Sequence, residues 1–423
     1  MNTLPTPKSF DLAIIGGGIA GCIMSISLTK HNIKHTLYEA ASQFGEIGAG
    51  IGFQPHIVKT MELISPDIKD AFLNTAESSD DEYPLFFNVS VGDLRKSGNN
   101  GQTPFCDWPA RGGLRGGVHR AHFLNELVKL IPDSIPKFRK RLVNITEAQD
   151  GNAVLQFSDG TTAKHSAVIG CDGIKSKTRE LVLGEEDAKP TFSGKYAYRG
   201  LIPMPKAIEI MGEHARKESQ MFCGYHGHVL TFPIAKGTIL NVVAFSSRKE
   251  WDSTNWVITT SKEHMLADYE HWNPKVRSII ANVQKPDIWA LFDHRPAKTY
   301  FLGRTICLVG DAAHASTPHQ GAGAGIGVED CYILGNLLGK IDDVKDLQKV
   351  FKAYDEVRRP RTQRVVTTSR EGGMMYEFEG QEGDDLEAIA KNMQTRMDWI
   401  WDADIVQDLE RAFRILQEEV LIS

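Results

Sequence analysis

The stretch that decides the fold is Phe10-Asp11-Leu12-Ala13-Ile14-Ile15-Gly16-Gly17-Gly18-Ile19-Ala20-Gly21, and Glu39 ends the next apolar run. Apolar residues lead into Gly-x-Gly-x-x-Gly, which opens an apolar helix, and an acidic residue follows about 20 positions later. The pattern predicts a buried strand, a tight turn, a helix and a second strand that together bind a dinucleotide. It does not separate FAD from NAD.

Each residue of this pattern has its own predicted task. Gly16 permits the tight turn, Gly18 lets the backbone approach a pyrophosphate, and Gly21 lets helix and strand pack closely. The N-terminus of the helix offers N–H groups without intrahelical partners to the phosphates. Glu39 is expected to accept hydrogen bonds from the adenosine ribose.

The composition is that of a soluble globular protein of 423 residues, with 41% hydrophobic and 24% charged residues. A net charge of −6 gives no electrostatic reason to expect nucleic acid or an anionic membrane as a partner. The six cysteines form no C-x-x-C pair, which predicts buried reduced thiols and no metal site. The first ten residues lack the apolar segment of a secretory signal, so we expect a cytoplasmic location.

The pattern of the chain changes several times after the first unit. A second Gly-rich loop, Gly45–Gly52, is followed by a helical segment, and the acidic run Ser78–Glu82 is expected to be a solvated loop. From Phe192 to Phe245 the sequence is rich in strand patterns with turn glycines. Thr305–Val309 predicts a strand that returns to the nucleotide-binding part, and the chain from Gly325 onward is mainly helical. The domains are therefore interleaved along the chain.

Two further motifs continue the nucleotide-binding pattern. They are Cys171-Asp172-Gly173-Ile174-Lys175-Ser176 and Gly310-Asp311-Ala312-Ala313-His314, the latter continuing as Pro318-His319-Gln320-Gly321-Ala322-Gly323-Ala324-Gly325. In this order the three motifs resemble those of the single-component FAD-dependent aromatic hydroxylases, the group A flavoprotein monooxygenases, and the resemblance covers essentially the whole chain. The sequence has no second Gly-x-Gly-x-x-Gly, which fits enzymes in which NADH or NADPH docks transiently while the flavin swings outward.

The resemblance implies non-covalently bound FAD. Asp311, at the tip of a strand, is expected to accept hydrogen bonds from the ribityl hydroxyls, with a simple strand-end turn as the alternative. The small residues Gly323 and Ala324 let backbone N–H groups approach the N1–C2=O edge of the isoalloxazine ring. The N-terminus of the following helix points there, and its dipole, worth about 0.3–1 kcal/mol, favours the anionic reduced flavin.

Three more residues are assigned through the resemblance. Asp172 supports the use of both flavin and nicotinamide, Arg120 matches a helix-borne arginine near FAD, and Gly52 matches a backbone contact to FAD. Arg120 could instead be a surface arginine, and Gly52 could serve only a turn.

A narrower resemblance, to the salicylate hydroxylases, lies in the middle and at the end of the chain. It is carried by Tyr198-Arg199-Gly200, by Leu230–Ile234 with Asn241–Phe245, and by Thr395–Trp401. Fungal phenol hydroxylases and dearomatases of polyketide pathways share much of this pattern. Some of them hold the phenolate with a tyrosine in the region of Phe232. Phe232 lacks that hydroxyl, so the dearomatase reading is weaker while remaining open.

His319 is the predicted base for substrate chemistry because it lies beside the flavin loop, and a purely structural role in that loop is the alternative. A free imidazole has a pKa of about 6.5 and a phenol about 10, so direct proton removal is uphill by roughly 5 kcal/mol. The site must therefore also lower the pKa of the phenol or pass the proton on. Arg199 and Arg248 are candidate partners of a substrate carboxylate. Arg199 could instead brace the domain interface, and Arg248 could simply be exposed.

We therefore predict an α/β protein with a Rossmann-like FAD-binding domain (residues 1–180 and 290–345), a β-rich substrate domain (181–289) and a helical C-terminal region (346–423). The expected enzyme hydroxylates a phenolic aromatic acid with NADH or NADPH and O2. With salicylate, attack at the carbon that bears the carboxylate expels CO2 and yields catechol. We expect a monomer or homodimer.

Three alternatives stay open. The enzyme could act on another phenol, as a hydroxylase or dearomatase, without decarboxylation. It could be a flavin reductase or dehydrogenase that never activates oxygen. Finally, it could be a non-enzymatic FAD-bound regulator.

Overall fold

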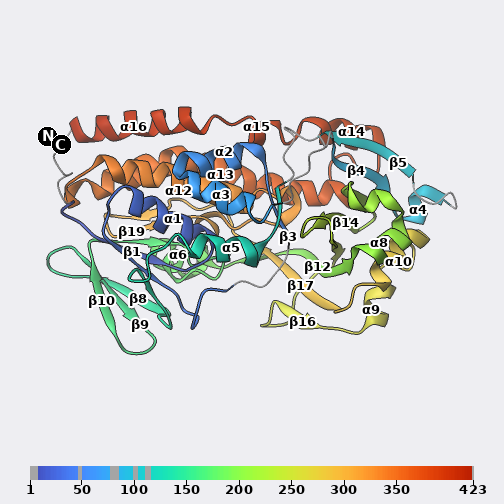
Figure 1. Ribbon diagram of the computed structural model, residues 1–423, viewed down its shortest axis with the longest axis horizontal. Coiled ribbons are helices and arrows are strands. Elements are labelled where there is room, and N and C mark those ends of the chain that lie inside the picture. Colours follow the sequence, from blue (N-terminus) through green and yellow to red (C-terminus); the bar gives the residue numbers. More distant parts are fainter. Residues whose placement is uncertain (1–7, 46–49, 77–84, 99–102, 110–115, 422–423) are drawn as a thin grey trace.

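The computed structural model describes residues 8–45, 50–76, 85–98, 103–109 and 116–421. Within them the chain forms two large β-sheets at opposite ends of an elongated molecule, and the long helix α13 (Leu347–Tyr376) runs past both (Figure 1). The acidic run Ser78–Glu82 and the centre of the Gly45–Gly52 loop lie outside the described residues.

The first sheet has six strands in the order β18-β19-β11-β1-β2-β7. β1 (Leu12–Ile15) pairs in parallel with β2 (His35–Tyr38) and β11 (Ala167–Gly170), and β11 pairs in parallel with β19 (Ile306–Leu308). β7 (Pro136–Lys137) and β18 (Phe301–Leu302) form the edges. All three sequence motifs follow the carboxyl ends of β1, β11 and β19, which is the edge where open α/β sheets bind ligands.

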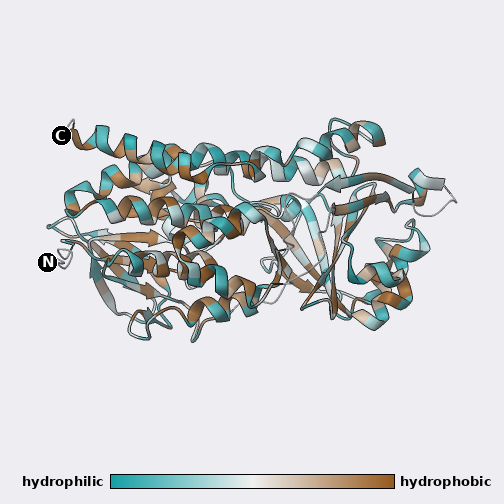
Figure 2. Ribbon diagram, turned by 45° about the horizontal axis from the view of Figure 1, so that its top comes forward, coloured by the Kyte–Doolittle hydropathy of each residue, from teal (hydrophilic) through white to brown (hydrophobic). Residues whose placement is uncertain are grey.

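Helices cover this sheet, as the apolar runs predict. α1 (Ile19–Lys30) follows β1, and its residues from Gly21 to Leu28 are buried because the helix lies between the sheet and α12 (Gly323–Lys340). α16 (Ile405–Leu421) lies along α12 and α13 on the outside, with hydrophilic and hydrophobic residues on different faces (Figure 2). The remaining helices of this part are α2 (Pro55–Ile64), α3 (Pro66–Leu73), α5 (Arg120–Val128), α6 (Lys177–Leu183), α7 (Glu185–Ala188) and α11 (Asp311–His314).

The second sheet has eight strands, in agreement with the predicted β-rich substrate region. In spatial order they are β16 (Val257–Thr259), β17 (Asp287–Asp293), β12 (Thr191–Pro203), β15 (Ile239–Ser247), β14 (Gly227–Ile234), β13 (Gln220–Gly224), β4 (Leu85–Val91) and β5 (Thr103–Pro109). One face of this sheet packs against α8 (Met204–Met211), α9 (Lys262–Ala267) and α10 (Pro274–Ala281). The opposite face turns toward the first sheet and carries part of the site.

The two strands at one end of this sheet come from the N-terminal part of the chain. β4 pairs in parallel with β13, with Asn88 opposite Gln220, and β5 pairs with β4. β4 and β5 therefore belong structurally with the second sheet, although the sequence-based division placed them in the FAD-binding segment 1–180. The physical reason is that this pairing joins residues about 130 positions apart, and local patterns carry no signal for it.

Smaller elements complete the fold. β8 (Leu142–Glu147), β9 (Ala153–Phe157) and β10 (Thr162–His165) form a separate antiparallel sheet. β3 (Gly50–Phe53) pairs with β6 (Gly116–His119). α4 (Leu94–Ser97) follows β4, and α14 (Leu386–Thr395) and α15 (Asp398–Trp401) lie beside β4 and β5.

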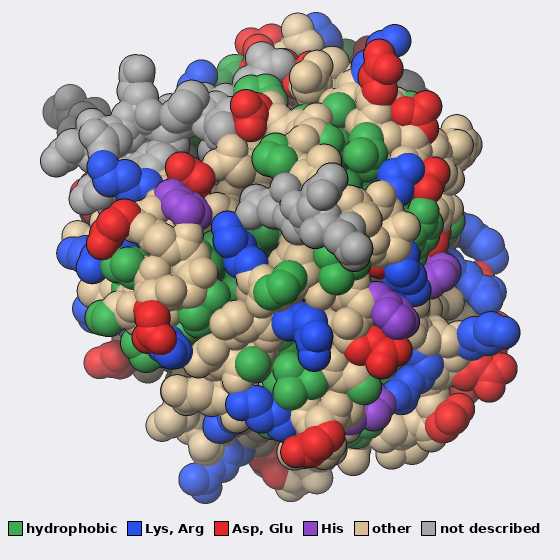
Figure 3. Space-filling view, turned by 90° about the vertical axis from the view of Figure 1, so that its right-hand side faces the viewer, with side chains coloured by type: hydrophobic (Ala, Val, Ile, Leu, Met, Phe, Trp, Pro, Cys, Tyr) green, Lys and Arg blue, Asp and Glu red, His purple; other side chains and the backbone are tan. Residues whose placement is uncertain are grey.

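Three findings bear on the chemical environment. All six cysteines are buried and none forms a disulfide, as predicted. Among the described residues, no helix combines the length and apolar character needed to cross a bilayer, and no cluster of His, Cys, Asp and Glu is arranged to hold a metal ion. On the face shown in Figure 3, Lys and Arg side chains are interspersed with Asp and Glu rather than gathered in one area.

Candidate functional site

A cavity of about 690 Å³ lies between the carboxyl edge of the first sheet and the inner face of the second. This volume is within the usual range for small-molecule and cofactor sites. The predicted site residues that line it are Gly16, Gly18, Glu39, Gly52, Arg120, Asp172, Arg199, Phe232, Asp311, His319, Gly323 and Ala324. Gly21 and Arg248 are the predicted residues that do not line it.

The first motif has the backbone geometry that its glycines predict. Gly16 has a φ of +102°, and a Cβ there would come within 2.4 Å of the Cys171 carbonyl oxygen. A Cβ on Gly21 would come within 1.9 Å of the Gly16 carbonyl oxygen, so Gly21 serves packing and not the cavity surface. Glu39 accepts hydrogen bonds from the backbone N–H groups of Gly17 and Ala41, both at 2.7 Å. These bonds hold its carboxylate at the cavity wall, and its contact with a ribose stays a prediction.

Asp172 organises the turn after β11. Its carboxylate accepts hydrogen bonds from Ser176 Oγ (2.6 Å), Thr178 Oγ1 (2.6 Å) and the Thr178 backbone N–H (3.0 Å). Burial raises the pKa of Asp172, and these hydrogen bonds offset only part of that effect. Asp172 thus fixes the start of α6 at the cavity wall, and its part in flavin and nicotinamide use stays a prediction.

Arg179 on α6 joins the second motif to the third, which sequence reasoning missed. Its buried guanidinium donates to the backbone carbonyls of Ala312 (3.2 Å) and Ala313 (2.6 Å). Burial lowers the pKa of Arg179 to about 10. Because two motifs far apart in sequence share this side chain, the positions of Asp172 and Asp311 are coupled.

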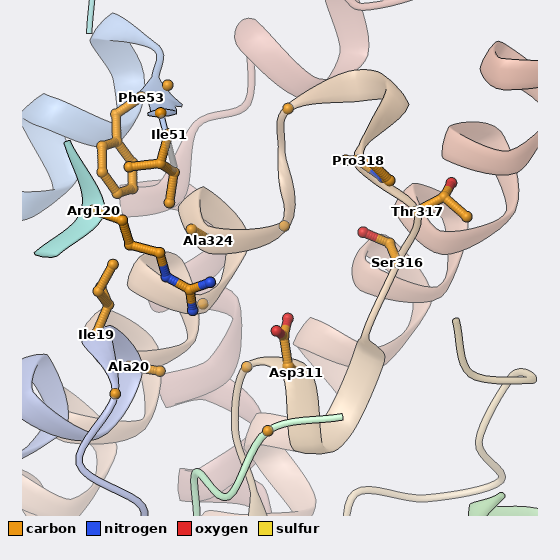
Figure 4. A pocket seen from close by; sticks show the side chains of 18 of the residues that line it. Ile19, Ala20, Ile51, Phe53, Arg120, Asp311, Ser316, Thr317, Pro318 and Ala324 are labelled. Carbon is orange, nitrogen blue, oxygen red and sulfur yellow. The ribbon is translucent and has the colours of Figure 1, made fainter. Parts of the chain in front are cut away.

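Asp311 is the first residue of α11, and its carboxylate points into the cavity. Figure 4 shows Arg120, the first residue of α5, extending into the same space from the opposite wall. The segment after α11 passes through Ser316 and Thr317 to Ala324, in the first turn of α12. The N-terminus of α12 therefore faces the cavity, as predicted.

A buried ionic cluster holds this wall from behind, and it too was not predicted. Asp330 on α12 accepts hydrogen bonds from the Gly310 backbone N–H (3.1 Å), His314 Nε2 (2.5 Å) and Arg358 Nε (2.8 Å). Arg358 also pairs with Glu329 at 2.8 Å, and the side chains of Arg358 and Asp330 are fully buried. Burial alone would lower the pKa of Arg358, but the two carboxylates raise it above its ordinary value.

The alternation of strand residues decides which side chains of the second sheet reach the cavity. On β15, Asn241, Val243 and Phe245 line it, while Val242 and Ala244 pack in the core on the other face. Arg199 on β12 is paired with Val243, so its side chain shares the cavity face.

Arg199 forms no ion pair with an acidic side chain of the described residues. Its Nε is buried and has no hydrogen-bond partner among the described residues, and its guanidinium lies 5.3 Å from the ring centre of Trp289. Burial, with a smaller effect from the nearby Arg120, lowers the pKa of Arg199 to about 10, so the side chain remains charged at neutral pH. A half-buried charge with no counter-charge among the described residues is costly, so this wall favours an anionic ligand.

Arg248 is not brought to the cavity. Arg248 comes directly after β15 and continues the series of Val242 and Ala244, which face away from the cavity. Its guanidinium packs over the rings of Tyr196 and Trp251, at 5.4 Å from each ring centre. The sequence-based expectation of a substrate contact therefore has no support in the geometry. The reason is strand register, which a lone sequence does not reveal.

Phe232 lines the cavity from β14, as the sequence suggests, and it offers no hydroxyl. It is paired with Asn241 on β15. The side-chain Nδ2 of Asn241 is buried without a hydrogen-bond partner among the described residues. Asn241 is thus an available donor in this part of the cavity, and sequence reasoning did not single it out.

His319 lies in the short 3₁₀ helix Pro318–Gln320, and its ring borders the cavity with 7% of the side chain exposed. Its ring centre is 4.9 Å from that of Phe245 and 5.3 Å from that of His228. Burial, followed by the neighbouring His228, lowers the pKa of His319 to about 3, so the ring is neutral at pH 7. Because a free phenol has a pKa of about 10, a proton resting on His319 lies roughly 9–10 kcal/mol uphill.

An extended dinucleotide cofactor fits this outline. The glycine turn at Gly16, the N-terminus of α12 and the carboxylate of Asp311 all border the cavity. The inner face of the second sheet closes the other end with aromatic and aliphatic side chains. Arg199 and His319 line the same cavity together with these side chains.

Comparisons with known proteins agree with this outline. A family model described as an FAD binding domain matches residues 134–369. The chain is 37% identical to a salicylate hydroxylase of Pseudomonas putida, covering 97% of this chain and 96% of that one. It is 39% identical to a 6-methylsalicylate 1-monooxygenase of Aspergillus terreus, with coverage of 97% and 93%. A solved salicylate hydroxylase substrate complex superposes with a TM-score of 0.85 at 31% identity, covering 97% of this chain and 98% of that one.

Proposed function

Because this chain belongs to the FAD-dependent monooxygenases of the salicylate hydroxylase type, we propose that it converts a salicylate-like hydroxybenzoate into a catechol and CO2, using NADH or NADPH and O2. The observation that carries the substrate class is the half-buried Arg199, which has no acidic partner among the described residues and lines the same cavity as His319. A ligand with adjacent carboxylate and hydroxyl groups can use both residues at once.

FAD, when bound, supplies the electrons taken from NAD(P)H and the activation of O2. The residues that would hold it are the glycines of the first motif, Glu39, Asp311 and the first turn of α12. Binding of the substrate and removal of its phenolic proton are assigned to the side chains that the second sheet and His319 contribute to the cavity.

The protein orients the substrate through three contacts. Arg199 binds the carboxylate, Asn241 donates a hydrogen bond, and the imidazole of His319 accepts the phenolic proton. The neighbouring Arg120 adds positive charge and, with Arg199, lowers the pKa of the phenol, which reduces the uphill proton transfer to His319. The apolar side chains of Phe232, Val243 and Phe245 limit access of water to the ring.

The site of hydroxylation is determined by the phenolate oxygen, which raises the electron density at the ring carbons ortho to it. The ring carbon that carries the carboxylate is ortho to the phenolate oxygen and accepts the hydroxyl group. The bond from that carbon to the carboxyl group then breaks, CO2 leaves, and the ring regains aromaticity. One oxygen atom of O2 enters the ring and the other becomes water, with NAD(P)H as the electron donor.

The decarboxylation is tested with salicylate labelled with ¹³C at the carboxyl group. We expect labelled CO2 and catechol in equal amounts, matched to the NAD(P)H consumed, and 6-methylsalicylate should give a methylcatechol in the same way. A dihydroxybenzoate that keeps the label would contradict decarboxylation and favour hydroxylation elsewhere on the ring. NAD(P)H oxidation that needs no O2 would contradict the monooxygenase reaction itself.

The role of Arg199 is tested with Arg199→Gln. A hydrogen-bonded charge pair contributes about 1.5–3 kcal/mol, so KM for salicylate should rise roughly 10- to 150-fold, while the FAD content stays that of the parent. Arg248→Gln is the matched control, because Arg248 lies outside the cavity and should leave KM unchanged. If the two variants have the same KM as the parent, Arg199 does not bind the carboxylate.

A further inference from the structure

A line of titratable side chains runs from the cavity to the protein surface behind His319. It begins at His228 on β14, whose ring centre is 5.3 Å from that of His319. His228 Nδ1 lies 2.9 Å from Glu377 Oε1, and Glu377 also pairs with Lys195 of β12. We call the residues that follow His319, in order, the polar line: His228, Glu377, Lys195, Glu379 and His226.

The outer half of the polar line is equally continuous. Lys195 Nζ donates to Glu379 Oε2 at 2.6 Å, and Glu379 Oε1 lies 2.7 Å from His226 Nδ1. The exposed fraction of the side chain rises from 0% at Glu377 to 26% at Glu379 and 68% at His226. One end is therefore buried beside the cavity, and the other is in contact with solvent.

The fold brings these groups together from three places. Lys195 and His228 come from strands of the second sheet, and Glu377 and Glu379 lie in the turn that ends α13. The turn is anchored to the sheet by a hydrogen bond from the His226 backbone N–H to the Glu377 carbonyl oxygen at 3.1 Å. The arrangement is thus fixed by backbone contacts as well as by the side chains.

The inner end has ring nitrogens available for proton transfer. Nδ1 of His319 and Nε2 of His228 are both buried and have no hydrogen-bond partner among the described residues. At the observed ring separation, one bridging water or a small ring rotation connects two such nitrogens.

The charges around the two histidines favour transfer of a proton to His228 over its retention on His319. Burial lowers the pKa of both His319 and His228. Burial alone would raise the pKa of Glu377, but His228 and Lys195 lower it to about 2, so its carboxylate is charged and lies directly behind His228. A proton that reaches His228 is therefore stabilised by an adjacent negative charge, which His319 lacks.

We propose that the polar line carries the phenolic proton of the substrate from His319 to the solvent. This inference rests on the proposed hydroxylation of a phenol. The O–H bond of the phenol breaks and its proton passes to His319, which hands a proton to His228 Nε2, while His228 Nδ1 gives one to Glu377. Lys195 then gives a proton to Glu379 and takes one from Glu377, and Glu379 releases its proton through His226. Every group regains its starting charge, the phenolate remains in the cavity, and one proton enters the solvent. His319, His228 and His226 are left in the opposite tautomer, and they return to the starting one by proton exchange or ring rotation before the next turnover.

The line acts by moving protons, so it changes rates and not equilibria. A purely structural salt bridge would instead alter how much substrate binds or how stable the protein is. The two roles are separated by measuring the rate of phenolate formation and its final amplitude in the same experiment.

The experiment mixes FAD-loaded enzyme with 5-nitrosalicylate, whose phenolate is coloured, in dilute buffer that contains a pH indicator. The main variant is Glu379→Gln, because this side chain is partly exposed and its replacement keeps the size. Glu270→Gln is the matched control, since Glu270 forms an exposed pair with His271 away from the cavity. Glu377→Gln is the second variant, with its FAD content and circular dichroism checked first.

In the parent and in Glu270→Gln, phenolate formation and proton release should share one fast rate. Glu379→Gln should slow both at least tenfold and leave the final phenolate amplitude unchanged, and Glu377→Gln, if it folds, should do the same. Proton release at the parental rate in Glu379→Gln would overturn the proposal, even if Glu377→Gln fails to fold. If the parent itself forms no phenolate and takes up no O2 with any hydroxybenzoate, the proposed function fails. If the parent oxidises salicylate but proton release in the variant is unaffected, only the polar line fails.

Discussion

His319→Asn is expected to lower kcat for salicylate by about 10²- to 10⁴-fold, the usual loss when a general base is removed. The residue borders the cavity and its ring is neutral at pH 7, so it can accept a proton from a phenol bound there. Asparagine keeps a polar group of smaller size but accepts no proton at neutral pH. FAD should stay bound, because the wall formed by Asp311 and α12 is untouched.

The measurement compares product formation with NAD(P)H oxidation in the same assay. The variant should continue to oxidise NAD(P)H while forming hydrogen peroxide in place of catechol, because electron transfer does not need the base. The parental kcat with the parental pH profile would show that His319 is structural. Loss of FAD from the variant would show that the histidine supports the flavin loop instead.

Arg358→Met is expected to lower the free energy of unfolding by about 3–5 kcal/mol, since removing one member of a buried ionic cluster leaves uncompensated charges. Asp330 would remain buried at 0% exposure with only His314 as an ionisable partner among the described residues, whereas Glu329 would keep its pair with Arg361 at 2.8 Å. The loss is therefore expected mainly at Asp330. Asp330 also anchors the Gly310 backbone N–H, so the start of α11 should loosen and FAD affinity should fall in parallel.

The matched control is Arg359→Met, one residue further along α13. Arg359 pairs with Asp355 at 3.0 Å and is itself one-third exposed, and the buried Asp355 would keep a hydrogen bond from the Tyr300 backbone N–H at 2.9 Å. We therefore expect a smaller loss than at the fully buried Arg358. Urea unfolding followed by circular dichroism, together with FAD titration, distinguishes the two variants. Equal losses in both would refute a special role for the cluster.

The nucleotide-binding half of the fold could be predicted because its signals are local. The apolar run Leu12–Ile15 predicts a strand buried on both faces. The glycines that follow it predict a tight turn with close backbone packing, because a side chain at Gly16 or Gly21 would clash with the backbone. Asp311 could be placed for a similar reason, since a strand ending in Gly-Asp leaves the carboxylate at the edge of the sheet. These residues meet at one edge because parallel strands all end there.

The substrate half could be predicted only in part, because it depends on register and on distant pairing. Arg199 and Arg248 look alike in sequence, and only the alternation along β12 and β15 sends one to the cavity and the other to Tyr196. The sequence contains one signal for the buried ionic cluster, the pair Glu329-Asp330 in the otherwise apolar helix α12. Two adjacent acids in such a helix need buried cations, but nothing in the sequence identifies Arg358 as one of them.

The order of strands in the first sheet also governs the timing of its assembly during synthesis. β1 lies near the start of the chain, whereas β19 is made of residues 306–308 and completes the edge that carries Asp311. At about 5–20 residues per second, the ribosome needs roughly 15–60 s to pass from one to the other. β11 (Ala167–Gly170) is made about halfway through this interval, and for the remaining roughly 7–27 s its edge that later pairs with β19 has no partner strand. The glycine turn lacks the opposite wall of its cavity during that time. We therefore expect cofactor capture only after β19 has been made, and chains truncated before Ile306 should not retain flavin.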